Sequence, residues 1–286
     1  MIIVKFWGVR GSIPTPGAST VKYGGNTSCV EVRINPEGST DSELIIIDAG
    51  SGIRLFGDEL LKEMPIKASI FFSHVHWDHI QGFPFFRPGF IKGNEFNLYG
   101  MRYSRETGYV RSILAGTLRG QQEFPNFPVG LDYMGSEMHF KDIEQNEVVT
   151  TRLANVSNRN LVHPGGSVAF RIEEKGSGKA IVYCSDTEHL NGLDKNVMML
   201  SENSSLLIYD SQYTPEEYKN HKGWGHSTWE QGLRLAKELN IPRLVLFHHD
   251  PGHSDTFLEE EILYPACQET DDIQVMLARE GMILRI

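Results

Sequence analysis

Short apolar runs, each bounded by turn residues, recur along the whole chain. Runs of this length that are rich in Val, Ile, Leu and Phe are typical of strands buried in a sheet. Every side chain in Leu44–Ile47 is apolar, which indicates a strand that is covered on both faces. The predicted strands are Ile2–Trp7, Asn26–Ile34, Glu43–Asp48, Ala68–Phe72, Phe96–Tyr99, Glu137–Phe140, Glu147–Leu153, Ser167–Glu173, Lys179–Cys184, Ser205–Asp210 and Arg243–Phe247.

Helical spacing of apolar residues occurs in fewer segments. Ser227 and Glu230 have the spacing of a capping box, in which each side chain bonds a backbone N–H at the start of a helix. The helix that they open ends before Pro242, which cannot continue it. Further helices are predicted at Ile53–Met64, Arg105–Leu118 and Asp255–Tyr264, and a closing hairpin at Gln274–Ile286.

The order of these elements favours one domain over residues 1–286. Strands followed by a helix occur in each half of the chain, which suits two sheets packed face to face with helices outside. The segment from Gly82 to Met134 is less regular and is dense in Phe, Pro and Gly. Its apolar loops are expected either to wall a substrate pocket or to cover the edge of a sheet.

Composition narrows the class of protein. The formal net charge is −10, which argues against a broad electrostatic footprint for nucleic acid or an anionic membrane. No apolar stretch is long enough to span a bilayer, and the first residues lack the pattern of a signal peptide, so a soluble cytoplasmic protein is expected. Cys29, Cys184 and Cys267 are widely spaced, and each is predicted to be a small buried side chain.

The most informative segment follows the predicted strand Ala68–Phe72. It reads Ser73-His74-Val75-His76-Trp77-Asp78-His79 and places four metal-binding side chains within six residues. His74 and His76 are two residues apart, so an extended backbone directs both to one side, and a turn into a helix directs Asp78 and His79 from another angle. One tetrahedral ion rarely needs ligands this crowded, whereas two adjacent ions can share them.

Other residues of ligand type follow predicted strands further along the chain. His163 precedes a Pro-Gly-Gly turn, Asp186 follows the strand Lys179–Cys184, and His248 follows the strand Arg243–Phe247. His249 is adjacent to His248 and is the alternative to it. Loops at strand ends are where binding residues concentrate, so these side chains are candidates for the same site.

With these motifs in this order, the chain resembles the metallo-β-lactamase-fold hydrolases. The resemblance implies an α/β (α+β) fold, a four-layered αββα sandwich with a dinuclear metal site at one edge of the sheets. It implies that His74, His76 and His163 hold one metal ion. It implies further that Asp78, His79 and His248 hold the other, and that Asp186 bridges the two. The ions implied are divalent, with zinc as the leading choice and manganese or iron as alternatives.

Within this family the chain resembles the ribonuclease Z and cyclic phosphodiesterase branch. The segment Gly225–Thr228 at a helix start, with Asp210 after an earlier strand, carries that likeness, as do Tyr23–Cys29 and Gly11–Pro14. The catalytic residues implied are His226, Asp210, which orients it, and Asp78. Asp48 resembles the carboxylate that supports a ligand histidine. The implied chemistry is attack on phosphorus by a metal-bound hydroxide.

Two features guide the expected substrate. The ribonuclease Z enzymes often carry a long basic arm between the third ligand His and the bridging Asp, and here only 22 residues separate His163 from Asp186 (186 − 163 − 1). With the net charge, this favours a small, cyclic nucleotide or phosphoribosyl cyclic phosphate and predicts no extended nucleic-acid surface. RNA 3′ processing is the alternative activity, and a metal- or nucleotide-binding sensor is the non-enzymatic one. A homodimer is left open as an alternative to a monomer, and no membrane partner is expected.

Overall fold

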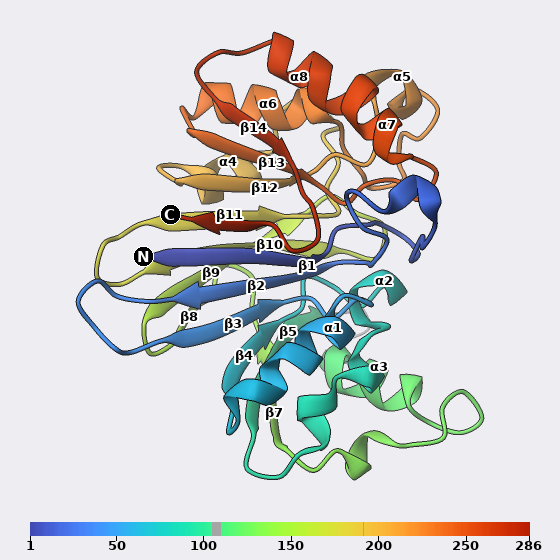
Figure 1. The fold of residues 1–286 in the computed structure, drawn as a ribbon, viewed down its shortest axis with the longest axis vertical. Coiled ribbons are helices and arrows are strands. Elements are labelled where there is room, and N and C mark those ends of the chain that lie inside the picture. Colours follow the sequence, from blue (N-terminus) through green and yellow to red (C-terminus); the bar gives the residue numbers. More distant parts are fainter. Residues whose placement is uncertain (105–109, 191) are drawn as a thin grey trace.

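The computed structural model describes residues 1–104, 110–190 and 192–286, and within them two β-sheets pack face to face between layers of helices (Figure 1). The first sheet runs β15 (Ile283–Arg285), β1 (Ile2–Gly8), β2 (Cys29–Ile34), β3 (Glu43–Ile47), β4 (Lys67–Phe71), β5 (Glu95–Ser104) and β6 (Val110–Ser112), with β7 (Glu137–Ile143) also paired to β5. The second runs β14 (Gln274–Leu277), β13 (Arg243–Phe247), β12 (Leu206–Asp210), β11 (Ala180–Cys184), β10 (Ser167–Glu174), β9 (Ala154–Leu161) and β8 (Val148–Thr150).

The two sheets are joined by a continuous apolar core. Alternate side chains of each strand point between the sheets, so every second residue of β1 is fully buried there. The rings of Phe6 and Phe247, from opposite sheets, lie 6.1 Å apart. Burial of such side chains contributes about 1.5–3 kcal/mol each, which makes this layer the main stabilising contact between the two halves of the chain.

Helices cover the outer face of each sheet. On the first sheet lie α1 (Ile53–Leu60), α2 (Trp77–Ile80) and α3 (Ile113–Gln121). On the side of the second lie α4 (Lys195–Ser201), α5 (Pro215–Tyr218), α6 (Trp229–Glu238), α7 (Asp255–Phe257) and α8 (Tyr264–Gln268). The predicted αββα sandwich is therefore confirmed. Within the described ranges, no helix is long and apolar enough to cross a bilayer.

Several predicted elements differ from the structure. The expected closing hairpin is wrong, because β14 pairs with β13 in one sheet and β15 pairs with β1 in the other. Thr228, not Ser227, caps α6, with its side chain accepting from the N–H of Gln231. The helix predicted at Arg105–Leu118 is confirmed from Ile113 onward as α3, whereas Val110–Ser112 form β6. Residues 105–109 lie outside the described residues. Cys267 is exposed, whereas Cys29 and Cys184 are buried as expected.

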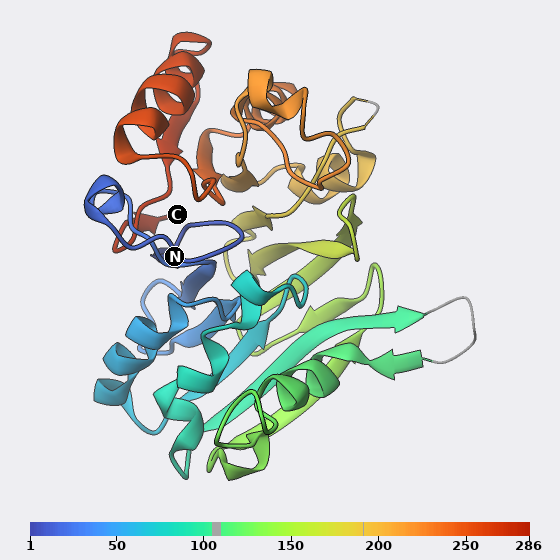
Figure 2. The same cartoon turned by 90° about the vertical axis from the view of Figure 1, so that its right-hand side faces the viewer.

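Parallel pairing places several strand ends at one edge of the sandwich. Strands β3 and β4 run parallel, as do β11, β12 and β13, so the residues after these strands gather on the same side. Figure 2 shows this edge facing the viewer. Asp48, Asp186 and His248 each follow one of these strands with a left-handed backbone, at φ of 60°, 57° and 62°. Such conformations cost an L-residue about 1–2 kcal/mol, and they turn each side chain out of the strand direction.

Candidate metal centre

The segment after β4 places its histidines through a sharp change of backbone direction. His76 is the N-cap of α2, with an extended ψ of 155°, and Trp77 begins the helix. His74 therefore lies on the extended segment, and Asp78 and His79 lie in the first turn of the helix. As predicted from the spacing, the side chains approach the edge of the sandwich from two directions, and all of them are buried except His76, which is exposed.

The structure brings all seven predicted ligands together. Four overlapping groups of described side chains have ligand atoms within 4.8 Å of one another and could hold a metal ion. Two of them include His226, and the other two consist of predicted ligands alone. Of these other two, the first group holds His74, His76 and His163, and the second holds Asp78, His79, Asp186 and His248.

Asp186 lies between the two groups. Its Oδ1 atom is 3.7 Å from Nε2 of His74 and 3.8 Å from Nε2 of His163. Its Oδ2 atom is 3.1 Å from Nε2 of His79 and 3.4 Å from Nε2 of His248. Each carboxylate oxygen thus faces a different group, which is the placement that a bridging ligand needs.

The carboxylate of Asp48 fixes the ring of His79 through its Nδ1 atom. Its Oδ2 atom lies 2.7 Å from Nδ1 of His79 and also accepts from the hydroxyls of Ser73 and Tyr183, each at 2.8 Å. The N–H of Ser73 donates to Oδ1 at 2.7 Å. A carboxylate in this place fixes the tautomer of the ring and leaves Nε2 free to bind a metal.

Gly225 and Glu188 support His163. Nδ1 of His163 donates to the carbonyl of Gly225 at 2.9 Å, and Nε2 lies 3.0 Å from Nδ1 of His76. The buried carboxylate of Glu188 accepts from the N–H groups of Gly223 and Gly225 and from the hydroxyl of Tyr218. Glu188 was not identified in the sequence analysis, and its place two residues after Asp186 was the only clue to it.

The two adjacent histidines after β13 have different surroundings. Nε2 of His248 lies 3.1 Å from Oδ2 of Asp78, and its Nδ1 lies 3.0 Å from Oε1 of Gln212. His249 lies outside both ligand groups, and its Nε2 is 2.9 Å from the carbonyl of Ala278. Burial lowers the pKa of His249 to about 3. The structure thus places His248, the favoured candidate, with the other predicted ligands. Gln212 was missed, because nothing in its sequence context marks it.

His226 lies beside the ligand cluster and is paired with a separate carboxylate, that of Asp210. Its Nδ1 lies 2.9 Å from Oδ2 of Asp210 and 3.9 Å from Oδ1 of Asp186. Backbone N–H groups of Thr187 and Gln212 donate to Asp210 and fix it in place. Burial lowers the pKa of His226, but Asp210 outweighs that effect and raises it to about 9. The His226 imidazole is therefore a cation that lies beside the ligand cluster.

The polar atoms of the cluster fit divalent ions. Nε2 of His74 and Nε2 of His79 are buried and form no hydrogen bond of suitable geometry within the described part of the chain, although Nε2 of His79 lies 3.1 Å from Oδ2 of Asp186. Burial lowers the pKa of His74 well below its usual range, which leaves that ring neutral. Burial opposes the charge of Asp78, but His79 and His248 hold its pKa well below its usual range. Neutral imidazoles and ionised carboxylates are the forms that bind metal, so the cluster matches what a divalent ion requires.

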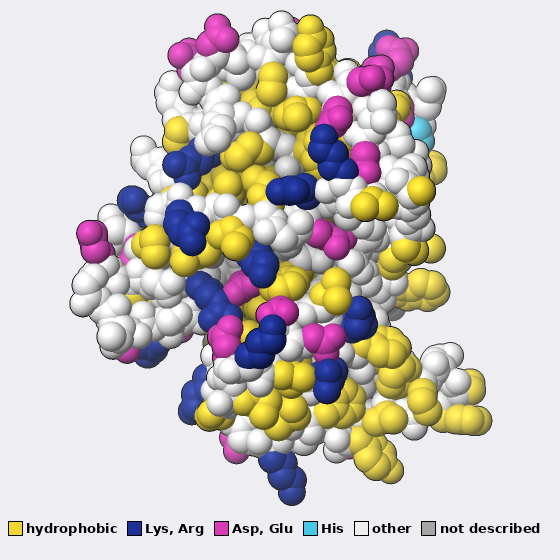
Figure 3. Space-filling model, in the orientation of Figure 1, with side chains coloured by type: hydrophobic (Ala, Val, Ile, Leu, Met, Phe, Trp, Pro, Cys, Tyr) yellow, Lys and Arg dark blue, Asp and Glu magenta, His cyan; other side chains and the backbone are white. Residues whose placement is uncertain are grey.

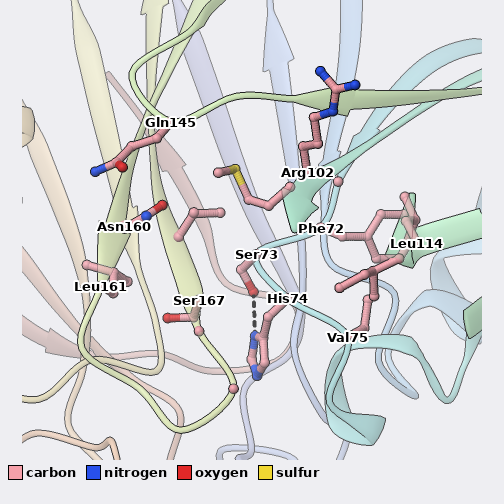
Figure 4. A pocket seen from close by; sticks show the side chains of 16 residues that line it. Phe72, Ser73, His74, Val75, Arg102, Leu114, Gln145, Asn160, Leu161 and Ser167 are labelled. Carbon is pink, nitrogen blue, oxygen red and sulfur yellow. Dashed lines mark hydrogen bonds between the residues drawn. The ribbon is translucent and has the colours of Figure 1, made fainter. Parts of the chain in front are cut away.

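A cavity of about 660 Å³ opens beside His74 (Figure 4). Arg102 and Gln145 lie at its upper end in this view and His74 at its lower end, with Leu114 of α3 on one side. Neither Phe83–Pro88 nor Phe124–Pro128 lines it. Phe83 and Phe86 pack instead in the core beneath α1, so the first loop covers the sheet, whereas Phe124 of the second loop is 92% exposed. Other residues of the Gly82–Met134 region, among them Ile113 and Leu114, line the cavity.

Comparisons with known proteins agree with this geometry. Residues 44–249 match the family model described as the beta-lactamase superfamily domain. A ribonuclease Z of Pyrococcus horikoshii is 25% identical over 299 residues, which cover 92% of this chain and 91% of that protein. The metallo-beta-lactamase fold protein YhfI of Bacillus subtilis superposes with a TM-score of 0.69 at 19% identity, with all of both chains covered. The short form of human tRNase Z has a TM-score of 0.66 at 20% identity, with 99% of both chains covered.

These relatives overturn one expectation. A small substrate alone, with no extended nucleic-acid surface, was predicted from the net charge and from the short interval between His163 and Asp186. That prediction is wrong, because a protein named a ribonuclease aligns with nearly the whole chain. The net charge is a sum over all residues and does not measure the charge near the cluster. Figure 3 shows Lys and Arg side chains interspersed with acidic ones on the face that it presents.

Proposed function

The chain belongs to the β-lactamase superfamily, and on that premise we propose that it is a metal-dependent phosphodiesterase that hydrolyses a phosphodiester of RNA. The observation that carries the proposal is the pairing of a seven-residue ligand cluster with a buried His226–Asp210 pair beside it. The names of the ribonuclease Z relatives, which align with the chain almost end to end, support RNA as the substrate class.

The proposed ligands divide the cluster between two ions. His74, His76 and His163 would hold one, Asp78, His79 and His248 the other, and Asp186 would face both. Divalent ions bound there would acidify water and offset the charge that develops on the phosphoryl oxygens. Zinc is our first choice of metal, since imidazole and carboxylate ligands suit it, and manganese and iron accept the same ligands.

The remaining chemistry falls to His226. Asp210 holds Nδ1 of the ring, which leaves Nε2 as the atom that can carry a proton to the leaving oxygen or donate a hydrogen bond to a phosphoryl oxygen. Because the Asp210 carboxylate is itself held by two backbone N–H groups, the imidazole is positioned before the substrate arrives.

A second candidate substrate is the one expected from the sequence, a cyclic nucleotide or phosphoribosyl cyclic phosphate, hydrolysed in addition to RNA. The observation that favours it is the antiparallel β10–β11 hairpin, which takes up most of the interval between His163 and Asp186 and leaves no room for a long arm. A small cyclic diester can reach the cluster without such an arm.

The test is a substrate panel on protein that has been stripped of metal and reconstituted with zinc, manganese or iron. The substrates are a tRNA precursor with a 3′ extension, cyclic nucleotides and phosphoribosyl cyclic phosphate. We expect RNA cleavage that chelation abolishes. Turnover of the cyclic diesters as well would support the second candidate, and turnover of the cyclic diesters without RNA cleavage would overturn RNA as the substrate. If no diester is cleaved, the phosphodiesterase proposal is wrong and a non-enzymatic binding role gains support.

We also propose that residues 1–286 form one domain, because a single cluster of buried side chains draws on both sheets. Neither sheet could expose its half of that cluster to water without losing the burial that stabilises both.

A further inference from the structure

Two tryptophans beside the ligand cluster expose most of their surface. The Trp77 side chain is 82% exposed and that of Trp224 is 60% exposed. Trp229, in contrast, is buried against α6 neighbours, and Trp7 stacks on Phe56 with ring centroids 5.0 Å apart. An indole left in water forgoes the stabilisation that its burial would give, so exposure at two such positions calls for an explanation other than folding.

Trp77 has a fixed backbone and an exposed side chain. It lies between the proposed ligands His76 and Asp78 and is the first residue of α2. Its carbonyl accepts from the N–H of Gln81 at 2.7 Å, which fixes the turn that carries it. Figure 3 shows hydrophobic side chains projecting from the right-hand edge of the molecule, on the side where Figure 1 labels α2.

The side chain of Trp224 packs against His221, which in turn packs against Tyr213. Its indole meets the edge of His221 with centroids 4.8 Å apart and an interplanar angle of 89°. His221 in turn stacks on Tyr213, with centroids 4.4 Å apart. Glu188 accepts from the N–H groups of the flanking residues Gly223 and Gly225. The exposed indole is thus oriented before any ligand binds, which lowers the entropy lost on binding.

The two segments that carry these indoles meet at His163. Nε2 of His163 lies 3.0 Å from Nδ1 of His76, the residue before Trp77. Nδ1 of His163 donates to the carbonyl of Gly225, the residue after Trp224, at 2.9 Å. The two exposed indoles are therefore each one residue away from a group that contacts His163.

Resting on the function proposed above, we infer that Trp77 and Trp224 stack on the bases of the nucleotides next to the cleaved phosphate. Stacking on aromatic side chains accepts every base, since each has a π-face, and it requires that the bases be unpaired. The substrate is therefore a single-stranded stretch of RNA with little sequence preference at the cut. A double-stranded region would have to end before it reached the cluster.

The test measures binding and cleavage separately for Trp77→Ala, Trp224→Ala and the conservative variants Trp77→Phe and Trp224→Phe. Binding is followed by the anisotropy of a fluorescein-labelled single-stranded oligoribonucleotide, with metal content determined for each protein. Each alanine variant is expected to raise Kd and KM about 5- to 150-fold, while phenylalanine retains most of the affinity. Tyr264→Ala, at an exposed aromatic residue on α8, is the control and should bind as the wild type does.

A second substrate separates stacking from a structural effect. An oligonucleotide with abasic residues beside the cleaved bond has the same phosphates and no bases to stack. The alanine variants should bind this oligonucleotide as well as the wild type does. An equal loss on intact and abasic substrates, or unchanged Kd for the intact one, would overturn the inference. If the wild type binds through the tryptophans but cleaves nothing, the proposed function fails and the stacking inference stands.

Discussion

Nδ1 of His79 lies 2.7 Å from Oδ2 of Asp48, which is 31 positions earlier in the chain and directly follows β3. The contact is fully buried, and the left-handed backbone of Asp48 directs its carboxylate at the ring. Burial opposes a charge on His79, but Asp186, Asp78 and Asp48 together raise its pKa well above the usual range. Metal binding at Nε2 would therefore displace a proton from this ring, and the carboxylate at Nδ1 would raise the basicity of the ligand atom.

Replacing Asp48 with Asn should weaken metal binding without unfolding the protein. Asn tolerates the left-handed backbone, but it is neutral and a weaker acceptor for Nδ1 of His79. Loss of such an outer partner typically costs 10- to 100-fold in metal affinity, and we expect a loss of about that size. Competition with a chromogenic chelator measures it. Asp58→Asn, on the exposed side of α1, is the matched control, and equal affinities for the two variants would contradict the role of Asp48.

His226→Ala should separate turnover from metal binding. The side chain lies outside the two ligand groups proposed for the ions, so metal content should stay near that of the wild type. Loss of a general acid lowers kcat by about 10²- to 10⁴-fold, and Asp210→Asn should lower it in the same direction. The measurement is kcat on a model diester, with metal content by elemental analysis. His139→Ala, on β7, serves as control, and full activity in His226→Ala would remove His226 from the mechanism.

The residues near the start of the site could be predicted because their spacing is local. His74, His76, Asp78 and His79 lie within six residues, and the alternation of a strand followed by a helical turn is enough to converge them. Glu188 and Gln212 could not be predicted, since each acts through contacts with residues more than 20 positions away. Their roles depend on which strands become neighbours, which no local pattern records.

Strand β9 could not be predicted from the sequence for a different reason. Its sequence has three asparagines in eight residues, and asparagine is depleted in strands. Asn158 is nevertheless buried, because its side-chain amide donates to the carbonyls of Glu144 and Glu147. A buried polar side chain is tolerated once its hydrogen bonds are satisfied, and those partners belong to the turn before β8. The sequence pattern could not reveal that compensation.

Glu188→Gln should loosen the segment that supports His163. The glutamine keeps one acceptor oxygen, but its NH₂ group lies against backbone N–H donors that face a carboxylate oxygen in the wild type. Hydrogen bonds to a charged group are worth about 1.5–3 kcal/mol, so urea denaturation should show a loss of that order. Metal affinity should fall too, because Gly225 accepts from His163. Glu216→Gln, at an exposed position of α5, is the control, and unchanged metal affinity in Glu188→Gln would contradict a positioning role.

The exposure of Cys267 predicts selective thiol labelling. Of the three cysteines, Cys29 and Cys184 are fully buried, and burial raises the pKa of both thiols well above the usual range. A thiol reagent such as DTNB attacks thiolate, so only Cys267 should react in the native protein. One equivalent is expected before denaturation and three after it. Cys267→Ser should abolish the native reaction, and a second reactive native thiol would show that the core is more open than described.

Removing the metals should destabilise the fold as well as abolish activity. The ionised carboxylates of Asp78 and Asp186 and the buried Nε2 atoms of His74 and His79 are gathered in a site that bound cations would satisfy. Ions that bind only the folded state stabilise it by about 2.7 kcal/mol per site at a free concentration 100 times Kd. Differential scanning fluorimetry should therefore show a Tm lowered by several degrees after chelation and restored by zinc, manganese or iron. Asp186→Asn removes the charge that faces both ligand groups, so its Tm should respond less to metal. An identical response in that variant, or no response in the wild type, would contradict a metal centre built around Asp186.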